Sequence, residues 1–299
     1  MLDHVLTLIG KLEGGVLPAT IDSVREALAR LGAETGPGLE LAPGLAADIP
    51  FRDMNPDQAD AAARAALGGA EIDIVAQPAE GRRKRLLVAD MESTLIRNEF
   101  LEELAAHLGL QAVVAEITRR AMNGEIDFAA ALRERVAMLE GLPVAVLEQA
   151  AGRMALMPGA ATLIATMRRA GAATVLVSGG FEYFTALVRD RLGLDRDIAN
   201  ALVIADGRLT GAVREPVLDR RAKLATLVQS AAALGIPLAS TAAVGDGAND
   251  IDMIQAAGLG IAFHPKPAVA AIAKQRIDHA DLTALLYAQG YRLDEFAAA

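Results

Sequence analysis

The chain has 299 residues, a hydrophobic fraction of 53% and a formal net charge of -9 at pH 7. This length suggests about two domains, and the acidic balance argues against a general nucleic-acid-binding protein, because such proteins are usually basic. Cysteine is absent, which excludes disulfide bonds and thiolate catalysis. The sequence has no apolar run long enough to cross a membrane, and its N-terminus carries charges where a signal peptide would be apolar. We therefore expect a cytoplasmic protein with no membrane partner.

Residues 1–80 show the patterns of a small α+β domain. The strand patterns lie at residues 4–10, 39–44 and 71–77, and the helix patterns lie at 20–32 and 55–69. Thr20 is the expected N-cap of the first helix, and glycine ends the second. The basic run GRRKR at 81–85 is the expected junction to the rest of the chain. Its charges are too few for a nucleic-acid surface in an acidic protein, so we expect a solvated linker.

Residues 81–299 alternate between strands and helices, which is typical of an α/β fold with a doubly wound parallel sheet. One helical segment, at about 97–155, interrupts this alternation after the first strand and contains no strand pattern. We expect it to form a cap over the C-terminal edge of the sheet. The dipeptide Asp206-Gly207 predicts a hairpin turn between two short strands.

Three apolar strands in this second domain end in polar residues. They are RLLVAD, TVLVS and TAAVGD, and their last residues are Asp90, Ser178 and Asp246. Because the carboxyl ends of parallel strands meet at one edge of a sheet, we expect these side chains to converge. Asp90 is then a candidate nucleophile.

The converging residues suit a phosphate ester and a divalent cation. Mg²⁺ prefers oxygen ligands, which Asp90, Asp246 and a backbone carbonyl in the turn after Asp90 would supply, with Asp250 as a ligand or a support. Ser178 and the N–H groups after it open a predicted helix and would bind an anion that Lys223 could also reach. Taken singly, each residue is better explained as a turn, a cap or a solvated lysine. Their order along one α/β pattern favours phosphoryl chemistry.

The motifs DMESTLI, VSGGF, Lys223 and VGDGANDI resemble the four signature motifs of the haloacid dehalogenase-like phosphatases. The cap segments NEFLEELA and AMNGEIDFAAALRERV resemble those of the phosphoserine phosphatase branch of this family. The resemblance covers roughly residues 85–290. Bacterial members often carry an N-terminal amino-acid-binding (ACT-like) domain, and residues 1–80 are compatible with one, although they show no specific motif.

The resemblance implies a role for each matching residue. Asp90 would form a phosphoaspartyl intermediate, and Asp90, Asp246 and the backbone of Glu92 would hold Mg²⁺ with support from Asp250. The implied phosphate contacts are Ser178, Gly179, Lys223 and Asn249. In the cap, the implied substrate contacts are Glu99 for an ammonium, Arg135 for a carboxylate, and Met122 and Phe128 as apolar positions that close over the site. Arginine suits a carboxylate because the two groups can pair through two parallel hydrogen bonds.

One position departs from the family pattern. Glu92 stands where the family has an aspartate that acts as general acid and base. The extra methylene moves the carboxylate by about 1.5 Å, and a misplacement of about 1 Å can cost on the order of 10²-fold in rate. We expect an active enzyme whose rate is reduced or restored by local compensation.

The resemblance implies Mg²⁺-dependent hydrolysis of O-phospho-L-serine, the last step of serine biosynthesis. Assembly as a homodimer is a further hypothesis. Two alternatives stay open. One is a phosphotransferase that passes the phosphoryl group to another alcohol such as homoserine. The other is an impaired amino-acid or phosphate sensor, which the intact set of Asp90, Ser178, Lys223 and Asp246 argues against.

Overall fold

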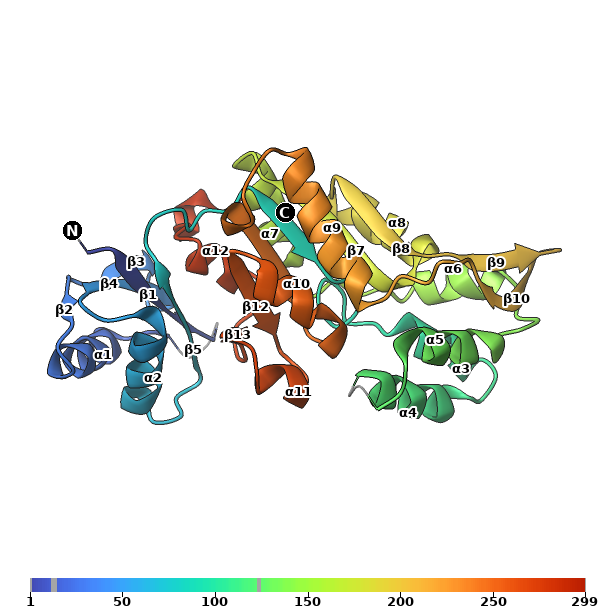
Figure 1. The fold of residues 1–299 in the computed structure, drawn as a ribbon, viewed down its shortest axis with the longest axis horizontal. Coiled ribbons are helices and arrows are strands. Elements are labelled where there is room, and N and C mark those ends of the chain that lie inside the picture. The colour runs from blue at the N-terminus through green and yellow to red at the C-terminus, as the bar shows by residue number, and fades with distance from the viewer. Residues whose placement is uncertain (1, 12–14, 123–124, 299) are drawn as a thin grey trace.

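The structure is a computed structural model that describes residues 2–11, 15–122 and 125–298, except for the side chain of Met122. Its N-terminal unit is an antiparallel sheet in the order β2-β4-β1-β5, with β3 paired to β4. Its elements are β1 His4–Gly10, α1 Pro18–Arg30, β2 Glu34–Thr35, β3 Leu39–Ala42, β4 Ala46–Arg52, α2 Pro56–Leu67 and β5 Ile72–Pro78. Figure 1 shows α1 and α2 together on one side of this sheet.

Local sequence explains most of these elements. The helix α2 begins with a capping box between Asn55 and Gln58, and it ends at Gly68 with a φ of 58°. The expected cap at Thr20 is wrong, because α1 begins at Pro18, whose fixed φ suits a first helical position. The strand β4 was not predicted, since Pro50 lies inside it and five of its seven residues are buried, which removes the alternating pattern.

The second unit is built on six parallel strands in the order β13-β12-β11-β6-β7-β8, which confirms the predicted parallel sheet. The strands are β6 Leu86–Ala89, β7 Ala173–Phe181, β8 Arg196–Asn200, β11 Thr241–Gly245, β12 Leu259–Phe263 and β13 Gln275–Ile277. Alternate residues of β6 enter different cores: Leu86 and Val88 pack with α9 and α10, whereas Leu87 and Ala89 pack with α7, α8 and α12. The sheet is therefore covered on both faces, and its central strands β6 and β11 are buried at every residue. These covering helices are α7 Ala160–Arg169, α8 Glu182–Leu192, α9 Arg220–Ala233, α10 Ile251–Ala256 and α12 Ala284–Ala288.

A helical insertion follows β6, as predicted. It contains α3 Phe100–Ala106, α4 Gln111–Met122, α5 Phe128–Ala137 and α6 Ala145–Ala151. The chain enters and leaves it through two adjacent segments, since the N–H of Arg97 donates to Ala155 O at 2.9 Å and the N–H of Met157 donates to Leu95 O at 2.9 Å. Figure 1 shows α3, α4 and α5 as one layer set apart from the sheet. We call the insertion the cap. We call the two segments that join it to the sheet, residues 95–97 and 155–157, the root of the cap.

The predicted hairpin turn is also found. Asp206 and Gly207 have φ values of 49° and 71° and join β9 Leu202–Ala205 to β10 Arg208–Val213. The hairpin is fastened to the cap, because the N–H of Gly141 donates to Leu209 O at 2.9 Å.

The basic junction at 81–85 is not the solvated linker that we expected. Arg82 pairs with the buried Asp48 of β4, and Arg83 pairs with Glu295 at 2.8 Å. Lys84 is buried and donates its Nζ–H groups to Gly81 O at 2.9 Å and Ala239 O at 3.0 Å. The two units pack against each other around this segment, which a local reading of charge cannot anticipate.

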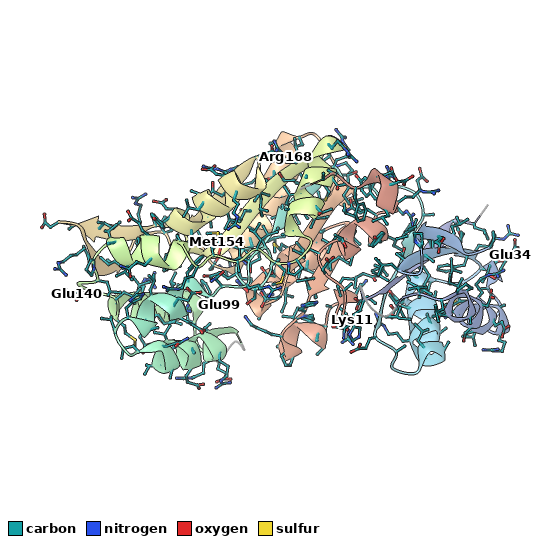
Figure 2. The ribbon with its side chains drawn as sticks, turned by 180° about the vertical axis from the view of Figure 1, so that it is seen from behind. Lys11, Glu34, Glu99, Glu140, Met154 and Arg168 are labelled. Carbon is teal, nitrogen blue, oxygen red and sulfur yellow. The ribbon has the colours of Figure 1, made fainter. Side chains whose placement is uncertain are left out.

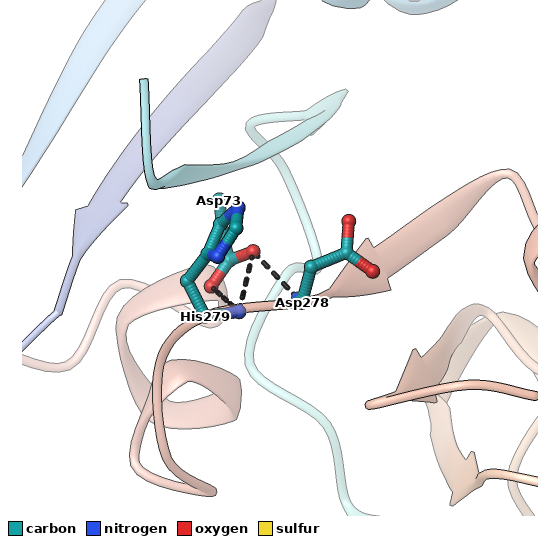
Figure 3. A group of neighbouring side chains, drawn as sticks. All are labelled: Asp73, Asp278 and His279. Carbon is teal, nitrogen blue, oxygen red and sulfur yellow. Dashed lines mark hydrogen bonds between the residues drawn. The ribbon is translucent and has the colours of Figure 1, made fainter. Parts of the chain in front are cut away.

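Asp73 of β5 makes a further link between the units (Figure 3). Its carboxylate accepts backbone N–H groups from Asp278 at 2.6 Å and Ala280 at 2.8 Å, and from His279 at 3.2 Å. Asp73, Asp278 and His279 lie close enough together to resemble a metal site. Both Asp73 oxygens are already used by these N–H groups, so the cluster is explained as a joint between β5 and the loop after β13. Among the described helices, none combines the length and the apolar character needed to span a bilayer.

Candidate active site

The three polar strand ends do meet. Asp90 follows β6, Ser178 lies near the end of β7, and Asp246 follows β11, and these three strands are neighbours in the sheet. Their side chains line one cavity of about 50 Å³ between the sheet and the cap. The other predicted residues that line the cavity are Glu92, Glu99, Phe128, Arg135, Gly179 and Asn249. Lys223 is not among the lining residues but bonds directly to Asp90.

Hydrogen bonds and an ion pair fix the backbone N–H and one carboxylate oxygen of Asp90. Its N–H donates to Val244 O at 3.0 Å, which fixes it beside β11. Its Oδ1 accepts the N–H of Met91 at 2.8 Å and lies 2.7 Å from Lys223 Nζ. No described residue donates a hydrogen bond to Oδ2, so this oxygen is available to a ligand in the cavity.

Lys223 is a buried cation between two carboxylates. It reaches up from α9, is 2% exposed, and donates to Asp250 Oδ1 at 2.6 Å. Burial lowers the pKa of Lys223, but the negative charges of Asp250 and Asp90 outweigh this effect and raise it above the usual value. The ammonium is therefore charged throughout the physiological range.

Asp90, Asp246 and Asp250 form an acidic cluster whose oxygens lie within 4.8 Å of one another. Asp250 also accepts the N–H of Gly247 at 3.0 Å. Burial and the charge of Asp90 raise the pKa of Asp250 to about 7, and burial raises the pKa of Asp246 to about 6. Three buried carboxylates in an all-oxygen setting, two of them with raised pKa values, form a donor set that fits a hard divalent cation.

Gly245 makes this cluster possible. A Cβ at this position would lie 2.3 Å from Asp250 Cγ, which is far inside van der Waals contact. The absence of a side chain at the end of β11 therefore lets the Asp250 carboxylate pack directly against the strand.

Lys266 is a site residue that the sequence reasoning missed. It lies in the loop after β12, and its Nζ is 3.1 Å from Asp246 Oδ2. It also lines the cavity. The available signal was the run FHPKP at the end of a fourth parallel strand, which reaches the same edge of the sheet.

Glu92 connects the turn after Asp90 to the cap. Its Oε1 accepts the N–H of Phe100 at the start of α3 at 2.8 Å. Its Oε2 faces Gly180, where a Cβ would lie 3.2 Å from this oxygen and 3.2 Å from Ser178 Oγ. The longer side chain thus has room because residue 180 has no side chain. Burial, followed by the charge of Glu99, raises the pKa of Glu92 well above its usual value, which favours the protonated form.

Ser178 and the two glycines after it do not open a helix, contrary to the expectation. They continue β7, which extends to Phe181, and α8 begins only at Glu182. The strand pairs with β8 at Val177 and again at Phe181, with a register shift between these two residues, and Asn200 Nδ2 donates to Gly179 O at 2.8 Å. The N–H of Gly180 donates to Ser178 Oγ at 2.9 Å, so the serine hydroxyl is oriented by its own loop.

Two opposite charges face the cavity from the cap side. The carboxylate of Glu99 accepts the hydroxyl of Ser93 at 2.7 Å, and burial raises its pKa. Arg135 is 4% exposed, and its guanidinium donates to Ala131 O at 3.1 Å and Thr118 Oγ1 at 2.8 Å. It forms no ion pair with any described carboxylate, and burial lowers its pKa. A buried guanidinium without a counter-ion is costly unless an anionic ligand completes it.

Phe128 closes the cap against the sheet. A Cβ at Gly179 would lie 2.8 Å from Phe128 Cζ, so the ring lies directly on the strand end. Asn249 is half-buried and also lines the cavity. The side chain of Met122 lies outside the described part of the chain.

Comparison with known sequences gives a consistent relationship. A model of the haloacid dehalogenase-like hydrolases matches residues 87–255. A phosphoserine phosphatase of Streptomyces coelicolor is 46% identical over 238 residues, which cover 80% of this chain and 58% of that protein. The chain therefore spans less than two thirds of the length of this relative.

Two solved structures are also similar. A haloacid dehalogenase family hydrolase from Salmonella enterica serovar Typhi matches with a TM-score of 0.83 and 29% identity, covering 95% of this chain and 98% of that one. A phospho-aspartyl intermediate analogue of phosphoserine phosphatase matches with a TM-score of 0.65 and 41% identity, covering 68% of this chain and 98% of that one.

Proposed function

Since this chain belongs to the haloacid dehalogenase-like hydrolase family, we propose that it is a phosphoserine phosphatase that hydrolyses O-phospho-L-serine to L-serine and phosphate. This reaction would be the last step of serine biosynthesis. The observation that carries the proposal is Arg135, a buried guanidinium that forms no ion pair with a described carboxylate and lines the same cavity as Glu99 and Asp90. An amino-acid phosphate ester offers one group for each of them: a carboxylate, an ammonium and a phosphate.

Mg²⁺ is the cofactor that we propose for the acidic cluster. Asp90, Asp246 and the backbone carbonyl of Glu92 would hold it, and Asp250 would support it from its contact with Lys223. When bound, it would offset the negative charges of the phosphate and the attacking carboxylate. The all-oxygen cluster and the raised pKa values of Asp246 and Asp250 support this assignment.

The first step is attack of Asp90 on phosphorus. The free Oδ2 forms the new O–P bond, and the bond between phosphorus and the serine oxygen breaks. Ser178, Lys223 and Asn249, together with the N–H of Gly179, would hold the phosphate oxygens. The leaving oxygen takes its electron pair and a proton from Glu92, whose raised pKa favours the protonated form.

The second step returns the site to its starting state. Water attacks the phosphorus of the aspartyl phosphate and gives a proton to Glu92, now a carboxylate. The Asp90–phosphorus bond breaks, and phosphate leaves. A solved phospho-aspartyl analogue of a phosphoserine phosphatase that is 41% identical to this chain supports such an intermediate.

The division of the chain belongs to the same proposal. We assign residues 1–80 to an ACT-like domain and residues 81–299 to the phosphatase domain, with its cap at about 97–155. The separate antiparallel and parallel sheets support this division. A cytoplasmic location and assembly as a homodimer stay predictions that cell fractionation and light scattering would test.

Phosphate release from phosphoserine, phosphothreonine and glycerol phosphate in Mg²⁺ tests the proposal. We expect a preference for phosphoserine, and we expect Arg135→Ala to lower its kcat/KM by roughly 10² to 10³-fold, because losing a buried charge pair costs about 3–4 kcal/mol. Equal rates on all esters would contradict the assignment of the cap residues. Added homoserine provides a further arm: a new phosphoester in place of free phosphate would indicate a phosphotransferase.

A further inference from the structure

A second cavity, of about 500 Å³, lies where the N-terminal unit, the root of the cap and the end of β12 meet. Lys11 contributes from the end of β1, Arg97 and Met157 from the cap root, and His264 from the end of β12. The residues that line it are different from those that line the active-site cavity. Its volume lies in the usual range of small-molecule sites, roughly 300–1,000 Å³.

The charges around this cavity favour an anionic ligand. Arg97 is exposed, and its guanidinium makes no hydrogen bond or ion pair within the described residues. Lys11 is the second fixed cation and pairs with Glu71 at 2.6 Å. The lining contains one carboxylate, Asp281, which accepts the N–H of Thr283 at 2.8 Å through Oδ1. Since Lys11 is paired with Glu71, Arg97 is the lining cation that no described carboxylate pairs, and it would be the partner of a ligand anion.

The other walls are apolar and well fixed. Met157 and Pro158 supply hydrophobic surface, and the fully buried Phe263 lies behind the His264 ring. The His264 ring stacks on Phe263 with centroids 4.1 Å apart, and it contacts Ala280 O through Nε2 at 2.9 Å. A planar guanidinium pairs with a carboxylate through two parallel hydrogen bonds, and the apolar wall offers burial to a hydrocarbon portion.

We infer that this cavity is a second ligand site, separate from the active site, for a small organic carboxylate with an apolar body. An unmodified carboxylic acid and an amino acid both offer this chemistry. They differ in their expected contact with Asp281. Its Oδ2 accepts no hydrogen bond from a described residue and is available to the ammonium group of an amino acid, which a plain carboxylic acid lacks.

The position of Arg97 connects this site to the cap. Arg97 and Met157 belong to the two segments that carry the cap, and their backbone N–H groups hold those segments together. Lys11 belongs to the N-terminal unit, and Figure 2 shows it on the side of that unit that faces the parallel-sheet unit. A carboxylate held by Arg97 beside Lys11 joins the cap root to the N-terminal unit and restricts movement of the root.

Saturation-transfer NMR of the full chain with valerate, norvaline and inorganic phosphate tests the inference. We expect both carboxylates to bind and Arg97→Gln to weaken them at least tenfold. The control is Arg153→Gln, which removes an exposed arginine of the cap that pairs with Glu103 at 3.5 Å and does not line the cavity. Tighter binding of norvaline than of valerate would assign the site to amino acids, and the reverse order to plain carboxylic acids.

Hydrogen exchange supplies a second readout. Bound carboxylate is expected to slow exchange of the amides of Arg97 and Met157 at least twofold in the wild type and to leave it unchanged in Arg97→Gln. Equal binding by Arg97→Gln and the wild type, no binding of either carboxylate, or equally tight binding of phosphate would each overturn the inference. Both variants are expected to melt within about 1 °C of the wild type, because Arg97 has no partner among the described residues and Arg153 makes only a long, largely exposed ion pair with Glu103.

Discussion

Shortening or neutralising Glu92 separates its contribution to the cap from its contribution to chemistry. In Glu92→Asp, loss of one methylene withdraws the carboxylate by about 1.5 Å, so the 2.8 Å bond to the N–H of Phe100 lengthens to about 4.3 Å and is lost. A lost bond at a helix start costs about 1 kcal/mol, or roughly 2–4 °C in Tm for a domain of this size. Glu92→Gln keeps the length and the acceptor oxygen but has no acidic proton.

We therefore expect opposite results from the two variants. Glu92→Gln should melt close to the wild type and lose about 10² to 10⁴-fold in kcat, the usual contribution of a general acid. Glu92→Asp should melt several degrees lower and keep measurable turnover. Phosphate release from phosphoserine and thermal unfolding in the same buffer provide both quantities. Full turnover by Glu92→Gln would refute the acid role, and an inactive wild type with an active Glu92→Asp would show that the longer side chain is disabling.

Two further predictions concern the acidic cluster. The folded pKa values of Asp246 and Asp250, about 6 and about 7, lie above the ordinary value of 3.8, so the folded state binds more protons between about pH 4 and pH 7. The free energy of unfolding of the metal-free protein should therefore fall as pH rises through this window. Mg²⁺ should raise Tm more at pH 7.5 than at pH 5. A Tm in EDTA that increases with pH would contradict this prediction. Gly245→Ala should lower the free energy of unfolding by about 1–3 kcal/mol, because the new Cβ overpacks against Asp250, and it should weaken Mg²⁺ binding in calorimetry. The control is Gly152→Ala, whose Cβ would lie no nearer than 3.5 Å to a neighbour. It should change the free energy of unfolding by less than about 0.5 kcal/mol. Equal stability of the two glycine variants would show that the cluster tolerates a side chain at the strand end.

The sequence predicts the active-site edge well because the decisive information is local. An apolar strand that ends in Asp90 or Asp246 specifies both burial and chain direction, and parallel strands bring such ends together. The segment around Ser178 was placed on the right strand, but its extended conformation is accompanied by contacts with β8 at Val177, Phe181 and Gly179 O, which no local pattern reports.

The features that the sequence did not predict depend on contacts between distant segments. Lys84 is buried where its Nζ donates to the carbonyl of Ala239, 155 residues further along the chain, and a basic run alone resembles a solvated linker. The strand β4 pairs with β1 in spite of Pro50, since its neighbours supply the hydrogen bonds and burial. Lys266 becomes a site residue through its contact with Asp246, in a loop that carries no motif of its own.

Mapping the covalent intermediate tests the central claim most directly. The protein is mixed with ³²P-labelled phosphoserine and Mg²⁺, quenched in acid, and digested for peptide mapping by mass spectrometry. The account predicts a label on Asp90 in the wild type and no labelled peptide in Asp90→Asn. A phosphoryl group on another residue, or undiminished hydrolysis by Asp90→Asn, would contradict it.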